Sequence, residues 1–197
     1  MSRADTITYS GILDEPATNG SPVNVTFAAF PGGPSFTLAA GTGDLDNYAS
    51  VGGASLLFAE GGGSNPSDPQ AFGFGSLISA ANATAANGLL LRYGLTGEST
   101  AGFKGGNWPQ NGNSAYLGFS FTASSQTYTG WAQISADVSG PPGSGSAELI
   151  DYAYEAGTSI DAGQGTAPEP SSLALFAIGG TAALALLRRR RAASQAS

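Results

Sequence analysis

Hydrophobic and polar residues alternate along several short stretches of the chain, with the period of a β-strand that buries one face. The stretch 116–122 places Leu117, Phe119 and Phe121 on one face. A short turn separates it from a second alternating stretch over 127–138, so the two predict an antiparallel hairpin. Further strands are expected over residues 6–13, 23–30, 35–39, 55–59, 71–78, 89–93 and 148–155.

The aromatic residues of the last two stretches indicate which faces are buried. Trp131 alternates out of phase with the apolar face formed by Tyr128, Ala132, Ile134 and Val138, and a buried position is favoured for it. In the stretch 148–155, strict alternation would place Ile150, Tyr152 and Tyr154 together on one face.

Composition agrees with a domain made of strands and turns. The chain has 197 residues, of which 30 are glycine and only 11% are charged. Ordinary soluble domains contain about 7% glycine and about 25% charged residues. Short strands joined by glycine-rich turns predict an all-β fold, an antiparallel β-sandwich of jelly-roll-like type, over residues 5–162.

The longest apolar run lies near the C-terminus. Residues 171–187 carry no charge, and as a helix they would reach about 25 Å, the short end of what spans a bilayer. They follow Pro168-Glu169-Pro170 and end at Arg188–Arg191. A single transmembrane helix is expected, with residues 163–167 as linker and 192–197 as cytoplasmic tail. The alternative is a buried core helix followed by a basic tail. Arginines stay on the cytoplasmic side, which places the body of the chain outside.

This tripartite ending resembles the PEP-CTERM sorting signal of exported bacterial proteins. The resemblance covers residues 168–191 and rests on Pro168, Glu169, Pro170 and the four arginines Arg188, Arg189, Arg190 and Arg191. It implies recognition and processing by exosortase, a membrane protease-transpeptidase, with cleavage near the Pro-Glu-Pro residues. It also implies transient anchoring in the inner membrane and an association with exopolysaccharide and biofilm. The block from Tyr116 to Gly163 is similar to the C-terminal block of many such proteins.

The N-terminus of the chain lacks the apolar segment expected of a signal peptide. Ser2 and Ala4 nevertheless have the small-x-small spacing of a cleavage site. Residues 1–4 are therefore interpreted as a remnant of a cleavage site or a misassigned start, with the mature chain beginning near Asp5. A chance match of so short a pattern is the alternative.

Charge and residue types exclude several functions. Residues 1–167 carry thirteen acidic and three basic residues, a net charge of −10, which repels nucleic acid and anionic lipid. The chain contains no Cys and no His, so thiolate chemistry, the usual zinc sites and histidine general bases are absent. No cofactor is expected.

A few residues could still carry chemistry. Asp44, Asp46 and Asn47 place three oxygen side chains close together, as in a Ca²⁺ loop, although a solvated turn is the simpler interpretation. Trp108, in a Gly/Asn-rich stretch, could stack on a sugar ring or cover the edge of the core. The acidic residues Asp137, Glu148, Asp151 and Glu155 lie on neighbouring expected strands, where a pair could serve glycoside hydrolysis or belong to ordinary surface.

Together these features favour a non-enzymatic exported protein of the cell surface or extracellular matrix. A carbohydrate-binding module in the same location is the first alternative, and a glycosidase-type enzyme is the second.

Overall fold

The computed structural model describes residues 7–42, 46–60, 68–94, 102–105, 108–109, 112–139 and 144–165. The described part is all-β, confirming the expected class, and all its strand pairs are antiparallel. The elements, in chain order, are β1 (Thr8–Tyr9), β2 (Glu15–Ala17), β3 (Val23–Thr26), β4 (Ser35–Thr42), β5 (Asp46–Ala54), β6 (Leu57–Ala59), β7 (Ala71–Phe72), β8 (Leu77–Ser79), the 3-10 helix η1 (Ala80–Asn82), β9 (Ala83–Ala85), β10 (Asn87–Gly94), β11 (Gly102–Gly105), β12 (Ser114–Ala123), β13 (Gln126–Asp137), β14 (Ser146–Ala156) and β15 (Ser159–Asp161).

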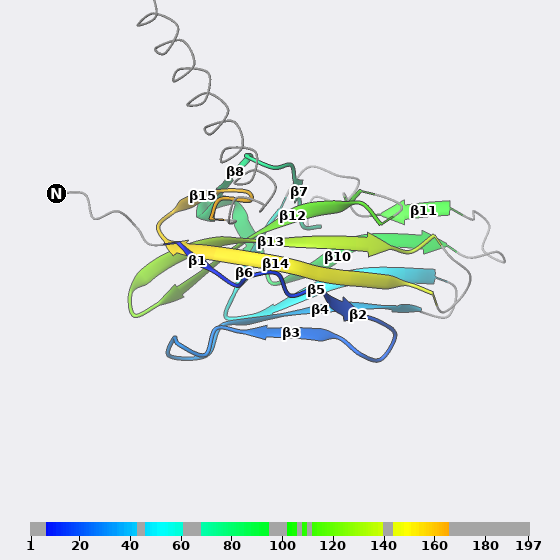
Figure 1. Ribbon diagram of the computed structural model, residues 1–197, viewed down its shortest axis with the longest axis horizontal. Helices are drawn as coiled ribbons and strands as arrows, with labels where there is room; N and C mark the ends of the chain where they lie inside the picture. The colour runs from blue at the N-terminus through cyan, green and yellow to red at the C-terminus, as the bar shows by residue number, and fades with distance from the viewer. Residues whose placement is uncertain are drawn as a thin grey trace, which may run out of the picture. The chain divides into compact units, whose positions relative to one another are not determined.

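These strands form three sheets, and Figure 1 labels their strands. The largest is 8-stranded, with the order β1-β14-β13-β12-β6-β9, and β2 and β7 pair with β14 and β12. A 5-stranded sheet with the order β11-β10-β5-β4-β3 covers its inner face, and the pair β15-β8 lies against its outer face. The strand order is not that of a jelly roll, because β3–β4–β5 and β12–β13–β14 are meanders within single sheets.

The main core lies between the two large sheets. Phe27, which directly follows β3, joins them, since its ring centroid lies 5.6 Å from that of Phe119 and 6.3 Å from that of Phe36. The fully buried side chains of this core alternate along their strands as the sequence predicts for one-sided burial. They include Phe36, Leu38, Leu91, Leu117, Phe119, Ile134 and Leu149.

A second, smaller core covers part of the outer face of the 8-stranded sheet. Trp131 is fully buried there, which confirms the expectation that it is a core residue. Its indole Nε1 donates a hydrogen bond of 3.0 Å to the carbonyl oxygen of Gln164. Ile78 of β8 and Ile160 of β15 cover this core on the side away from the 8-stranded sheet. Gln164 was expected in a linker, and its carbonyl is instead held against the folded body.

A bulge in β14 decides which side chains reach which core. Gln133 pairs with Asp151 and the next residue, Ile134, pairs with Leu149, so Ile150 is the extra residue. Leu149 therefore enters the main core, while Asp151 points to the outer face. The predicted grouping of Ile150 with Tyr152 and Tyr154 is wrong for this reason: only the two tyrosines pack against the main core.

Other sequence expectations are changed by tertiary contacts. The expected strand over 6–13 is paired only at Thr8–Tyr9, and beyond it Ser10, Leu13 and Asp14 form separate hydrogen bonds with β14. Residues 46–54, part of which was interpreted as a solvated turn or a Ca²⁺ loop, form strand β5 in the centre of the 5-stranded sheet.

The C-terminal helix predicted over 171–187 lies outside the described residues, as do Pro168, Glu169, Pro170 and Arg188–Arg191. Within the part of the chain that the structure describes, no helix has the length and apolar character needed to cross a membrane.

Gly130 on β13 allows the close packing of the main core. A Cβ atom at this position would lie 2.5 Å from Phe119 Cε2 and 2.6 Å from the Ala153 carbonyl oxygen. We expect Gly130→Ala to lower the free energy of unfolding by about 1–3 kcal/mol, as overpacking does. Gly52→Ala on β5 is the matched control, since nothing lies within 4 Å of its Cβ position. Urea denaturation of both variants checks this, and equal midpoints would contradict the packing argument.

Candidate functional site

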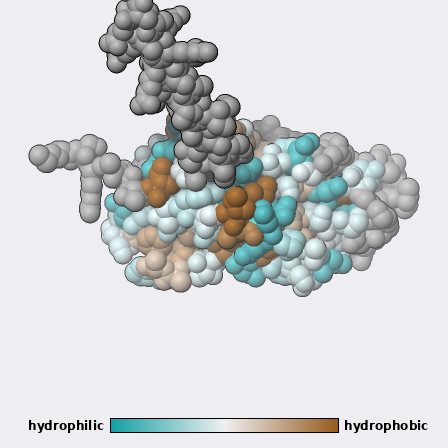
Figure 2. Space-filling model, viewed as in Figure 1, coloured by the Kyte–Doolittle hydropathy of each residue, from teal (hydrophilic) through white to brown (hydrophobic). Residues whose placement is uncertain are grey.

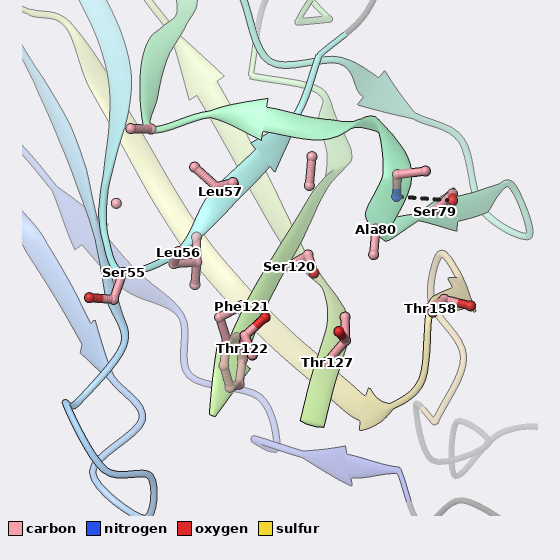
Figure 3. A pocket seen from close by; sticks show the side chains of 14 residues that line it. Ser55, Leu56, Leu57, Ser79, Ala80, Ser120, Phe121, Thr122, Thr127 and Thr158 are labelled. Carbon is pink, nitrogen blue, oxygen red and sulfur yellow. Dashed lines mark hydrogen bonds between the residues drawn. The ribbon is translucent and has the colours of Figure 1, made fainter. Parts of the chain in front are cut away.

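A groove of about 820 Å³ opens at the hairpin end of the outer face. Figure 3 shows Thr122 and Thr127, which face each other across the β12–β13 hairpin, between the Ser55–Leu57 segment and the Ser79–Ala80 segment. Among the described residues that line the groove, none is acidic or basic. They are Gly53, Ser55, Leu56, Leu57, Ser79, Ala80, Ala81, Ala83, Ala86, Ser120, Phe121, Thr122, Thr127 and Thr158.

The hydroxyl groups of the groove come from four separate parts of the chain. Ser120 Oγ donates a hydrogen bond of 2.9 Å to the Tyr128 carbonyl, and Ser79 Oγ accepts one of 3.3 Å from Ala81 N. Thr122, Ser55 and Thr158 are exposed. A hydroxyl both donates and accepts, so this lining suits an uncharged ligand rich in hydroxyl or amide groups.

Ser55 has a backbone φ of 56°, in the left-handed region that side chains other than glycine rarely adopt. It occupies the crossover from β5 in one sheet to β6 in the other, where the chain must turn sharply. Strain of this kind persists only where the surrounding structure imposes it. The crossover therefore fixes one wall of the groove.

A buried carboxylate forms a second polar feature of the outer face. Asp151 is only 4% exposed, and its Oδ2 accepts a hydrogen bond of 2.8 Å from the Tyr9 hydroxyl. Its other oxygen, Oδ1, is buried without a hydrogen-bond partner among the described residues. Tyr9 stands beside Trp131, with ring centroids 6.2 Å apart, so the pair lies at the margin of the second core.

Burial is the largest cause of the pKa shifts of both Asp151 and Tyr9. It raises the pKa of Asp151, an effect that the Tyr9 hydrogen bond opposes and that the nearby Asp14 charge reinforces. The pKa of Tyr9 rises to about 12 because of burial, the hydrogen bond to Asp151 and the charge of Asp151. The pKa of Tyr116 is also raised, first by burial and then by the Asp151 charge.

Two of the candidate acids line a shallow depression of about 280 Å³ on the outer face. Asp137 and Glu148 meet there beside Ser135 and Ser146. The pKa of Asp137 is lowered by hydrogen bonds from the Ser139 hydroxyl and backbone N–H, so this carboxylate is ionised at neutral pH. Ser135 Oγ lies 3.5 Å from Glu148 Oε2. Asp151 and Glu155 do not line this depression.

The predicted sugar contact of Trp108 does not fit its position. Trp108 is 3% exposed and its Nε1 donates a hydrogen bond of 3.1 Å to the Ile134 carbonyl, within the main core. An indole buried in this way presents no face to a sugar ring. The alternative given by the sequence, an aromatic ring that covers the edge of the core, matches the structure.

The candidate Ca²⁺ ligands are engaged elsewhere. Asp46 Oδ2 accepts hydrogen bonds from the Arg92 guanidinium, including one of 2.7 Å from Nε. Asn47 Oδ1 accepts a bond of 2.9 Å from Thr42, and its Nδ2 donates to the Val138 carbonyl. Asp44 lies outside the described residues. The residues that the structure describes contain no cluster of three or more acidic side chains able to hold a metal ion.

Sequence reasoning missed both the groove and the Tyr9–Asp151 pair. The two residues of the pair are 142 positions apart. Alternation had already placed Asp151 on the face opposite Tyr152 and Tyr154, but nothing in the sequence showed that this face is covered. The groove hydroxyls carried no signal, because Ser and Thr are frequent throughout the chain.

Comparison with known proteins identifies the C-terminal segment. The PEP-CTERM protein-sorting motif matches residues 166–191. No curated protein and no solved structure gave a significant match to the chain. The chain therefore carries a PEP-CTERM sorting motif, the signal of an exported protein that is processed by exosortase. This confirms the resemblance drawn from Pro168-Glu169-Pro170 and the terminal arginines.

The Tyr9 hydroxyl is expected to stabilise the fold through Asp151. Tyr9→Phe leaves a buried carboxylate without a donor, which costs about 2 kcal/mol at pH 7. Because the folded pKa of Asp151 is raised, the folded state binds a proton more tightly than the unfolded chain. The penalty of burying the charge therefore grows as pH rises through that folded pKa and is absent below the unfolded pKa.

We accordingly expect the cost of Tyr9→Phe to shrink as the pH is lowered toward the unfolded pKa of an aspartate, about 4. Tyr154→Phe is the matched control, since Tyr154 lies on the opposite face of β14 and should show no such pH dependence. Chemical denaturation of both variants at a series of pH values measures the effect. An identical pH profile for the two would show that the Tyr9–Asp151 bond contributes nothing.

Proposed function

We propose that the folded body of this exported protein is a non-catalytic domain of the cell surface or extracellular matrix that associates with exopolysaccharide. The sorting motif over 166–191 supports the export route. The observation that carries the proposal for the body is the hydroxyl-lined, uncharged groove at its hairpin end. Sugar hydroxyls and groove hydroxyls can exchange hydrogen bonds without the desolvation cost of a buried charge.

The roles of the acidic side chains also favour a non-catalytic body. Asp46 is paired with Arg92, and Asp137 is held ionised by Ser139. Hydrolysis of a glycoside needs a carboxylic acid that remains protonated to act as general acid. Asp151 has a raised pKa, but its carboxyl group is buried under Tyr9 and away from the groove.

The sorting motif makes a first testable prediction. Replacing Pro168, Glu169 and Pro170 together by alanine removes the residues near which cleavage is expected. The uncut chain should then accumulate in the membrane fraction of cells that express exosortase. Ser194→Ala with Gln195→Ala, in the residues beyond the arginines, is the control and should leave processing intact. Immunoblots of fractionated cells report both, and normal cleavage of the triple variant would overturn the prediction.

The groove makes a second prediction. The double substitution Thr122→Val and Thr127→Val replaces each hydroxyl group by a methyl group at nearly constant volume. The processed protein should then bind exopolysaccharide from the producing cells about tenfold more weakly, the loss expected for two hydrogen bonds of about 0.7 kcal/mol each. Thr26→Val on the edge strand β3 is the control. Affinity electrophoresis measures the change, and binding that is unaffected in the double variant would exclude the groove.

A depolymerase activity would contradict the non-catalytic assignment. The place to look is the depression that holds Asp137 and Glu148. Activity on exopolysaccharide that is lost in Glu148→Gln or Asp137→Asn would identify a glycosidase-type enzyme instead.

A further inference from the structure

Exposed apolar side chains are few in the described part of the domain. Figure 2 shows hydrophobic surface gathered in small patches on a face that is otherwise hydrophilic or intermediate. The large hydrophobic residues that remain exposed are Ile12, Leu57, Phe74 and Leu77. Leu57 lines the groove, Phe74 lies in the turn between β7 and β8, and Leu77 is the first residue of β8. Phe74 is 75% exposed and Leu77 is 64% exposed.

The segment that carries Phe74 and Leu77 is held in place by backbone hydrogen bonds. Ser76 N donates to the Gly73 carbonyl at 3.1 Å, which closes a tight turn. Gly75 N donates to the Ala162 carbonyl at 2.8 Å, and Ala162 N donates to the Ser76 carbonyl at 2.9 Å. The two apolar side chains are thus held at the surface by a fixed turn. Their exposure to water does not stabilise the fold, and exposed apolar patches commonly mark interaction sites.

This turn lies beside the point at which the described chain ends. A Cβ atom on Gly163 would lie 2.6 Å from Phe74 Cδ2, so the ring packs directly over that backbone. Only residues 166–170 separate Gly165 from the uncharged stretch that begins at Ser171. The six steps along the chain from Gly165 to Ser171 span at most about 22 Å when fully extended. A membrane that holds the uncharged stretch is therefore within about that distance of the surface around Phe74.

We propose that Phe74 and Leu77 contact the lipid surface of the membrane while the tail is uncut, and so orient the body during processing. This rests on the insertion of residues 171–187 in the membrane, which the uncharged stretch and the sorting motif lead us to expect. The occupant is the interfacial region of a bilayer, where an aromatic ring and a leucine side chain partition favourably. Two side chains alone give weak attachment, but the short tether keeps the bilayer at a high effective concentration.

Charge favours a neutral lipid surface for this contact. Asp161 pairs with Leu77 across β8 and β15 and is exposed, and the body as a whole is strongly acidic. Anionic lipid should therefore weaken the contact, and zwitterionic lipid should support it. Once the tail is removed the tether is lost, and the contact should be lost with it.

Tryptophan fluorescence provides the test, because Trp108 and Trp131 are both buried. The full chain carrying Phe74→Trp or Leu77→Trp is reconstituted into phosphatidylcholine vesicles that contain brominated lipid. The expected result is a blue shift and quenching of the added indole. Ile12→Trp, at a site 73% exposed on the N-terminal segment, is the matched control and should show neither. Equal quenching at all three positions, or none at positions 74 and 77, would overturn the proposal.

Vesicle flotation separates this proposal from the one on which it rests. If the full chain fails to float with vesicles, both the membrane insertion of residues 171–187 and the lipid contact of Phe74 and Leu77 are overturned. A chain that floats while positions 74 and 77 stay unquenched overturns only the lipid contact. A blue shift that instead depends on protein concentration, in detergent and without lipid, would identify a second copy of the chain as the occupant and would also overturn it.

Discussion

The central strands β12, β13 and β14 are buried on their inner face and, over part of their length, on their outer face as well, and the rest of the described domain is arranged to meet that requirement. Their inner face packs against the 5-stranded sheet through Phe119, Ile134 and Leu149. Their outer face is closed over part of its length by β8 and β15, which cover Trp131. A sheet that faced water on one side would expose this indole, so the small third layer is a consequence of the residues on the central strands.

The bulge at Ile150 allows the single strand β14 to supply side chains to both cores. Without the extra residue, Leu149 and Asp151 would share a face, and either a carboxylate would enter the main core or a leucine would leave it. The bulge sends Leu149 inward and Asp151 outward, where Tyr9 supplies a hydrogen bond. The N-terminal segment is thereby tied to β14 by a polar contact and by the backbone bonds of Leu13 and Asp14 to the Ile150 carbonyl.

The layer of β8 and β15 covers only the middle of the outer face, so this face has three regions with different chemistry. The hairpin end is the uncharged groove, the middle is the second core, and the opposite end is the depression with Asp137 and Glu148. The turn that holds Phe74 belongs to the cover itself and adjoins the end of the domain at Gly165. The proposed binding in the groove, the stability of the second core and the proposed lipid contact near Gly165 can therefore be tested by separate substitutions.

The sequence by itself determined what depends on local order: the strands with regular alternation, the hairpin of β12 and β13, and the sorting motif. These signals are carried by neighbours in the chain, so they can be read without a fold. Tertiary structure alone decided the burial of Trp108, the pairing of Asp46 with Arg92, the Tyr9–Asp151 bond and the groove. Each depends on segments distant in sequence, and a bulge of one residue reverses the face of every residue after it.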